Sequence, residues 1–159
     1  MICRSPCCYA GSLECGNHRC SDRVMNEDLD MELIQVAREA RELAYAPYSG
    51  FQVGSALRAR SGRIFTGCNV ENSSYGLTIC SERVALTKAV SEGEREFDSI
   101  AVCAPGAPAP CGACRQVLNE FCPDVAVFLV DPHATPVGKV TLKQLLPSAF
   151  DGSFLDPTS

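Results

Sequence analysis

The 159-residue sequence has no apolar run long enough to cross a membrane as a helix, and no internal repeat or low-complexity region. Its first residues, 1–6, lack the apolar stretch of a signal peptide. A surplus of positive charge is also absent, because the formal net charge is −5. General nucleic-acid-binding proteins normally carry a basic face, so that class is disfavoured. These absences predict a soluble, cytoplasmic, single-domain protein that binds neither nucleic acid nor membrane.

Cysteine, by contrast, is abundant, with 11 residues in the chain. An odd count without a secretion signal argues against a framework of disulfides. The segment 1–26 has little apolar periodicity, and its cysteine spacing matches no standard zinc finger. We therefore predict a disordered, Cys-rich extension over 1–26 and a folded domain with a C-terminal tail over 27–159; a second zinc site in the extension is the alternative. The residues that such a site would use are Cys3, Cys7, Cys8, Cys15, His18 and Cys20.

Two short motifs carry the clearest chemical signal: Cys80-x-Glu82, and a later Pro-Cys-x-x-Cys that holds Cys111 and Cys114. Three thiolate ligands leave the fourth position of a tetrahedral zinc site open, as in catalytic sites. Zinc holds and acidifies a water at such a position. Glu82 is two residues from a predicted ligand, so it can lie beside that water without binding the metal. Zinc-dependent base deaminases are known to use this order of residues.

Other interpretations of these cysteines remain open when each motif is taken alone. Cys111-x-x-Cys114 is also typical of a redox pair at a helix start, or of half a structural zinc site. A lone Cys80 fits a buried apolar residue. A redox protein leaves Cys80 and Glu82 without a role, and a zinc-stabilised interaction module would bind metal without turnover. The combination favours a catalytic site, because each motif is predicted to open a helix, where thiol pKa values are lowered.

The chain from about Leu29 to about Leu155 resembles the small homotetrameric cytidine deaminases. The resemblance implies a three-layer α/β/α sandwich with a mixed five-stranded sheet, and one zinc ion per chain. It also implies hydrolysis of cytidine and deoxycytidine in pyrimidine salvage, by a homotetramer whose active sites are completed by neighbouring subunits. A blasticidin-type deaminase shares the metal motif and is an alternative. Five segments carry the resemblance in order: Tyr45–Gly54, Asn69–Tyr75, Cys80–Arg83, Pro110–Gln116 and Leu145–Phe150.

The resemblance assigns zinc binding to Cys80, Cys111 and Cys114, and proton transfer to Glu82. Asn69 and Glu71 are two residues apart at a predicted strand end, so their side chains can point the same way. By resemblance they hold the ribose, and the carboxylate disfavours a nearby phosphate. The alternative for this pair is turn formation.

Two aromatic residues and two arginines complete the predicted site. By resemblance, Phe51 contacts the base, although a core position at a strand start is nearly as compatible with the sequence. Phe150 is expected to reach the active site of a neighbouring subunit. Three thiolates give a zinc site excess negative charge, which Arg83, one helical turn after Cys80, and Arg115, next to Cys114, can offset. The alternative for both arginines is a solvated surface charge.

Apolar spacing predicts the order of helices and strands. A helix is expected from residue 28 until Pro47, then a hairpin of strands over 51–60 and 63–68. Helices at 80–90 and 111–121 alternate with strands at 99–104 and 125–130, and a short helix follows at 141–146. This order predicts a mixed sheet with helices on both faces.

Overall fold

The computed structural model describes residues 27–134 and 138–155, so the predicted extension over 1–26 lies outside the described residues. Within these ranges, no helix is both long and apolar enough to cross a membrane. The helices are α1 (Glu27–Arg41), α2 (Ser81–Ser91), α3 (Gly112–Asn119) and α4 (Leu142–Leu145), with 3-10 turns η1 (Tyr75–Leu77) and η2 (Gly152–Leu155). The strands are β1 (Gly54–Ala59), β2 (Ile64–Cys68), β3 (Phe97–Cys103), β4 (Ala126–Val130) and β5 (Gly138–Thr141).

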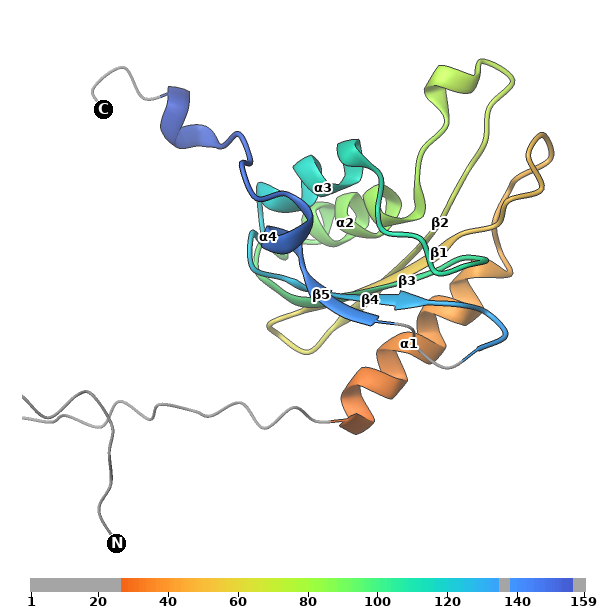
Figure 1. The fold of residues 1–159 in the computed structure, drawn as a ribbon, viewed down its shortest axis with the longest axis horizontal. Coiled ribbons are helices and arrows are strands. Elements are labelled where there is room, and N and C mark those ends of the chain that lie inside the picture. The colour runs from red at the N-terminus through yellow and green to blue at the C-terminus, as the bar shows by residue number, and fades with distance from the viewer. Residues whose placement is uncertain (1–26, 135–137, 156–159) are drawn as a thin grey trace, which may run out of the picture.

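The five strands form one mixed sheet in the order β2-β1-β3-β4-β5. Strands β3 and β4 run parallel, and the other neighbouring pairs are antiparallel. Figure 1 shows α1 on one face of this sheet and α2 and α3 on the other. The predicted three-layer α/β/α fold with a mixed five-stranded sheet is therefore confirmed.

Alternating side chains on the central strands build a separate core on each face of the sheet. On β1, Ala56 packs with the α1 residues and the following Leu57 packs with the α2 residues. Ala101 and Val102 on β3 divide in the same way. Both faces of the central strands are thus covered, as expected for a sheet that includes a parallel pair.

The structure differs from the predicted elements at three places. Strand β5 was missed because it is short, half-exposed and charged at Lys139, with no apolar alternation to signal it. Helix α1 ends at Arg41, well before Pro47, and β1 begins only at Gly54. A Cβ atom on Gly54 would lie 2.2 Å from the backbone nitrogen of Arg41, so the end of α1 crosses this glycine in close contact.

Candidate metal centre and adjoining cavity

Three cysteine sulfurs meet where α2 and α3 begin. Cys80 and Cys111 are the N-caps of these helices, both with extended backbone, and Cys114 lies in the first turn of α3. The three Sγ atoms lie within 4.8 Å of one another, with 3.5 Å between Cys111 and Cys114 and 3.9 Å between Cys80 and Cys111. Tetrahedral zinc with Zn–S bonds of about 2.3 Å places its sulfurs about 3.8 Å apart. The cluster therefore fits one zinc ion per chain, and no other such group of three exists in the described part of the chain.

A glycine on β2 allows the first turn of α2 to lie directly on the sheet. A Cβ atom on Gly67 would be 2.2 Å from the carbonyl oxygen of Ser81 and 2.5 Å from the backbone nitrogen of Ala85. Any larger residue would push the helix start away from the sheet. The same approach brings the N-termini of α2 and α3 together at the sulfurs, where their partial positive charge favours thiolates.

Arg83 supplies further positive charge next to the cluster. Its Nη2 atom lies 3.7 Å from Cys80 Sγ and donates to the carbonyl oxygen of Thr78 at 3.2 Å. A hydrogen bond from the Cys114 thiol, and then the Arg83 guanidinium, lower the pKa of Cys80 to about 5. The hydrogen bond to Cys80, followed by burial, raises the pKa of Cys114. Arg83 therefore lies close to the predicted ligand Cys80, as its position one helical turn along the chain led us to expect.

Glu82 is buried beside the sulfurs and has only 4% of its surface exposed. Burial raises the pKa of its carboxyl group, and the charge of Cys80 acts in the same direction. One of its oxygens, Oε2, accepts a hydrogen bond of 3.0 Å from the hydroxyl of Ser81. A buried carboxyl group with a raised pKa is suited to general acid–base work, because it holds a proton more readily than an exposed one.

A cavity of about 400 Å³ lies against the sulfur cluster. This volume is within the range of small-molecule sites, roughly 300–1,000 Å³. The predicted residues Phe51, Asn69, Glu71, Cys80, Glu82 and Cys111 all line it, although they come from separate parts of the chain. The full lining is Ser49, Phe51, Val53, Asn69, Glu71, Tyr75, Thr78, Cys80, Glu82, Val102, Pro108, Ala109 and Cys111.

Asn69 and Glu71 line the cavity and also hold the loop that precedes β1. Asn69 accepts from the backbone nitrogen of Val53 and donates to the carbonyl oxygen of Phe51, each at 2.8 Å. Glu71 accepts from the backbone nitrogens of Tyr48 and Ser49 at 2.9 and 3.2 Å, and from the Ser49 hydroxyl at 2.5 Å. The Ser49 hydroxyl is the main cause of the lowered pKa of Glu71, followed among its hydrogen bonds by the Tyr48 backbone. These side-chain bonds hold the loop at residues 48–53 and explain why β1 starts later than predicted.

The remaining predicted residues are two aromatic residues and Arg115. Phe51 is 42% exposed at the cavity and is not a core residue at a strand start. Phe150 is 53% exposed, stacks on Phe154 with ring centres 5.6 Å apart, and does not line the cavity of its own chain. Arg115 donates to the backbone oxygens of Pro110 and Leu145 at 2.7 and 3.0 Å. It thus fixes the residue before Cys111, and its contribution to charge balance stays a prediction.

Sequence reasoning missed several lining residues, among them Ser49, Tyr75 and Thr78. Each lies inside or next to a segment that carries the family resemblance, so the region was found but the individual side chains were not. The position of Ser49 depends on a loop conformation that Glu71 fixes from 22 positions away along the chain. Nothing in the local pattern around Ser49 distinguishes it from an ordinary turn residue.

Comparison with known proteins gives one consistent family. Residues 27–130 match the model of the cytidine and deoxycytidylate deaminase zinc-binding region. A cytidine deaminase of Sporosarcina psychrophila is 49% identical over 126 residues, which cover 77% of this chain and 92% of that protein. The crystal structure of cytidine deaminase from Burkholderia pseudomallei shares 48% identity and superposes with a TM-score of 0.72, covering 76% of this chain and 98% of that one. A blasticidin-S deaminase of Bacillus cereus is less similar, at 33% identity over 74% of this chain and 89% of that protein.

Proposed function

The chain belongs to the cytidine and deoxycytidylate deaminase family and is a zinc-dependent enzyme, and we propose that it hydrolyses cytidine and deoxycytidine. The products are uridine or deoxyuridine and ammonia, which places the reaction in pyrimidine salvage. The observation that carries this proposal is the meeting of three cysteine sulfurs and the buried Glu82 in one nucleoside-sized cavity. The 49% identity to a cytidine deaminase, against 33% to the blasticidin-S deaminase, favours cytidine over blasticidin S as substrate.

Cys80, Cys111 and Cys114 would hold the zinc ion, which supplies an acidified water when it is bound. Glu82 accepts a proton from that water at a carboxylate oxygen and delivers it to N3 of the base. The water oxygen forms a bond to C4, and the same carboxylate then takes the proton that remains on that oxygen and delivers it to the amino group. The C4–N bond breaks, ammonia leaves, and the C4 carbonyl of the product forms. The raised pKa of Glu82 suits this role, because the group must hold a proton between the two transfers.

The cavity lining provides contacts for both parts of the nucleoside. Phe51 presents an aromatic face to the base, and Asn69 and Glu71 bind the ribose hydroxyls. The Asn69 amide still has an uncommitted N–H when it donates to the carbonyl oxygen of Phe51. Oε2 of Glu71 already accepts from two backbone nitrogens, whereas Oε1 accepts only from the Ser49 hydroxyl and keeps a lone pair for a ribose hydroxyl. The negative charge of Glu71 favours a free nucleoside over a nucleotide, because a phosphate close to this carboxylate would be repelled.

We also propose that the enzyme works as a homotetramer in the cytoplasm. The tail exposes Phe150, Phe154 and Leu155, of which the last two are each 70% exposed. Such apolar area suits a subunit interface, where Phe150 would help to cover the base in a neighbouring cavity. The described cysteines are free thiols, which fits a reducing compartment. Sedimentation analysis of the purified protein would test the oligomeric state.

Incubation of the purified protein with cytidine tests the proposed activity directly. Conversion to uridine changes the ultraviolet spectrum, and released ammonia provides a second readout. Metal analysis of the same sample should give about one zinc per chain. Bound zinc without turnover of cytidine or deoxycytidine would contradict the proposed substrate and favour a different member of the superfamily.

A further inference from the structure

Two buried serines connect β1 to the start of α2 and end at the carboxylate of Glu82. Ser55 lies on β1, Ser81 is the first residue of α2, and both are 0% exposed. Their hydroxyl oxygens are 2.6 Å apart, and Ser81 Oγ lies 3.0 Å from Glu82 Oε2. Glu82 lines the cavity, whereas neither serine does. These three side chains form a continuous hydrogen-bonded series, named here the hydroxyl chain.

The chemistry of the groups fixes the direction of the hydroxyl chain. A hydroxyl group has one proton to donate and two lone pairs to accept with, whereas an ionised carboxylate only accepts. Ser81 therefore donates its proton to Glu82 Oε2. Since that proton is committed, the short contact between the two hydroxyls requires Ser55 to donate to Ser81.

The backbone around the hydroxyl chain leaves it little freedom. Ser55 is paired in register with Gly67 of β2, the same glycine on which the first turn of α2 lies. Ser55 also shares its sheet face with Leu57, two residues along β1, which packs in the core beneath α2. Both serines thus project from a strand and a helix where the two are in close contact at Gly67. Groups on rigid elements hold a catalytic side chain more accurately than groups on loops.

Resting on the proposed function, we infer that Ser55 and Ser81 are positioning residues for the deamination. The terminal torsion of a glutamate is broad and roughly two-fold, so an unheld carboxylate samples many orientations. The hydroxyl chain holds Oε2 of Glu82, and through it the orientation of the carboxyl group that lines the cavity. Small misplacements of a catalytic group can lower a rate by about 100-fold, so this restraint affects turnover directly.

The competing explanation is that the hydrogen bond between Ser55 and Ser81 only stabilises the fold. Kinetic measurements distinguish this explanation from a positioning role. The variants to compare are Ser81→Ala, Ser55→Ala, the double variant, and Ser99→Ala. Ser99 is a buried serine on β3, 6% exposed, and serves as the matched control for loss of a core hydroxyl. Measurements are kcat and KM for cytidine, zinc content, and the midpoint of urea unfolding of each protein as purified.

We expect Ser81→Ala to lower kcat about ten-fold while KM stays within about two-fold of wild type, because a hydrogen bond to a charged group is lost. Ser55→Ala should lower kcat by about three-fold, since it acts on Glu82 only through Ser81. The double variant should be no slower than Ser81→Ala alone. Its unfolding midpoint should equal or exceed that of Ser81→Ala, which leaves the Ser55 hydroxyl buried without its acceptor. Ser99→Ala should match the kcat of wild type.

A kcat for Ser81→Ala within about two-fold of wild type would overturn the inference, as would an equal loss in Ser99→Ala. If Ser81→Ala does not fold, Ser55→Ala decides, and an unchanged kcat in that variant overturns the inference. Additive effects of the two serine substitutions on both kcat and unfolding would overturn it as well. The wild-type protein separates this result from failure of the proposed function: if it does not deaminate cytidine, both fall together, and if it does, only the inference is at stake.

Discussion

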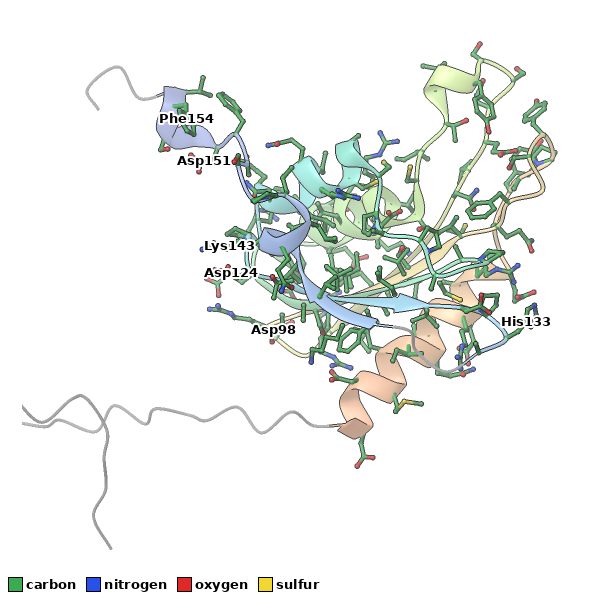
Figure 2. The ribbon with its side chains drawn as sticks, in the orientation of Figure 1. Asp98, Asp124, His133, Lys143, Asp151 and Phe154 are labelled. Carbon is green, nitrogen blue, oxygen red and sulfur yellow. The ribbon has the colours of Figure 1, made fainter. Side chains whose placement is uncertain are left out.

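The metal centre and the C-terminal tail differ in how far their side chains are buried by their own chain. At the centre, Cys114 is 0% and Glu82 is 4% exposed, and their neighbours come from both helix starts. On the tail, Phe154 and Leu155 are each 70% exposed. Figure 2 shows Phe154 and Asp151 on a segment that projects away from the body of the fold. The three sulfurs and Glu82 are therefore brought together within one chain, whereas the apolar side chains of the tail stay largely exposed on theirs.

The tail nevertheless has a defined local conformation. The carboxylate of Asp151 accepts from the backbone nitrogen of Ser153 at 2.9 Å, and Phe150 stacks on Phe154. Gln116 on α3 donates to the carbonyl oxygen of Phe150 at 2.7 Å, which ties the tail to the helix that holds Cys114. In our proposal, zinc binding and proton transfer depend on residues of one chain, and covering of the base depends on the tail of a neighbouring chain. Each prediction below tests one of these two parts.

The largest effect is expected from removing the proton carrier at the centre. Glu82→Gln keeps the size of the side chain but cannot exchange the proton, so turnover should fall by roughly 100- to 10,000-fold. Zinc content should stay at about one per chain, because the three predicted ligands, Cys80, Cys111 and Cys114, are unchanged. Kinetics with cytidine and metal analysis of the same sample would check both parts. Deaminase activity near the wild-type level would show that another group moves the proton.

A smaller loss of activity or zinc affinity should follow from removing the positive charge of Arg83 beside the cysteine sulfurs. Arg83→Ala removes the guanidinium near Cys80 Sγ, and loss of such partners typically costs 10- to 100-fold in metal affinity or activity. Arg115→Ala is the matched comparison, because this arginine binds the backbone oxygens of Pro110 and Leu145. Arg115→Ala should lower the thermal unfolding midpoint, and it should retain more zinc against a chelator than Arg83→Ala does. Equal zinc retention in Arg83→Ala and wild type, at equal rates, would make Arg83 an ordinary surface charge.

A substitution in the tail should change the affinity for cytidine and leave the chemical step unchanged. Phe150→Ala should raise KM for cytidine by roughly 2- to 13-fold, as expected for loss of one aromatic contact, with zinc content unchanged. The decisive test mixes Glu82→Gln chains with Phe150→Ala chains after dissociation and reassembly. Some mixed cavities then combine an intact Glu82 with the intact Phe150 of a partner, and affinity should partly recover. No recovery, despite proven exchange of subunits, would mean that Phe150 acts within its own chain or not at all.

The centre was predictable from sequence because its residues lie at fixed short spacings on two helix starts. Cys80, Glu82, Cys111 and Cys114 could be grouped without knowing any loop conformation, and the structure brings them together. The central strands were found for a similar reason, since alternating or continuous apolar residues mark them. The five-stranded sheet itself came from the family resemblance, because β5 has no apolar signal of its own.

The features that sequence reasoning missed depend on contacts between distant residues. Glu71 holds the loop at Tyr48 and Ser49, and Asn69 holds the loop at Phe51 and Val53. The predicted strand over 51–60 therefore began too early, because side-chain hydrogen bonds hold residues 51–53 as a loop and β1 begins at Gly54. Ser55 and Ser81 form a buried pair although 26 positions separate them, and each alone looks like an unremarkable small residue. Pairings of this kind follow from the register of β1 against β2 and the approach of α2 at Gly67.

The smallest effect is expected from the other end of the chain. A protein that begins at Met25 lacks most of the Cys-rich extension but keeps α1 and all five strands. The family match also starts at residue 27, after this extension. The shortened protein should fold, bind about one zinc per chain and deaminate cytidine within about two-fold of the full-length rate, because no predicted ligand or cavity residue is removed. Circular dichroism, metal analysis and steady-state kinetics on both lengths would check this. Loss of a second equivalent of zinc together with activity would show that the extension binds metal and that the centre depends on it.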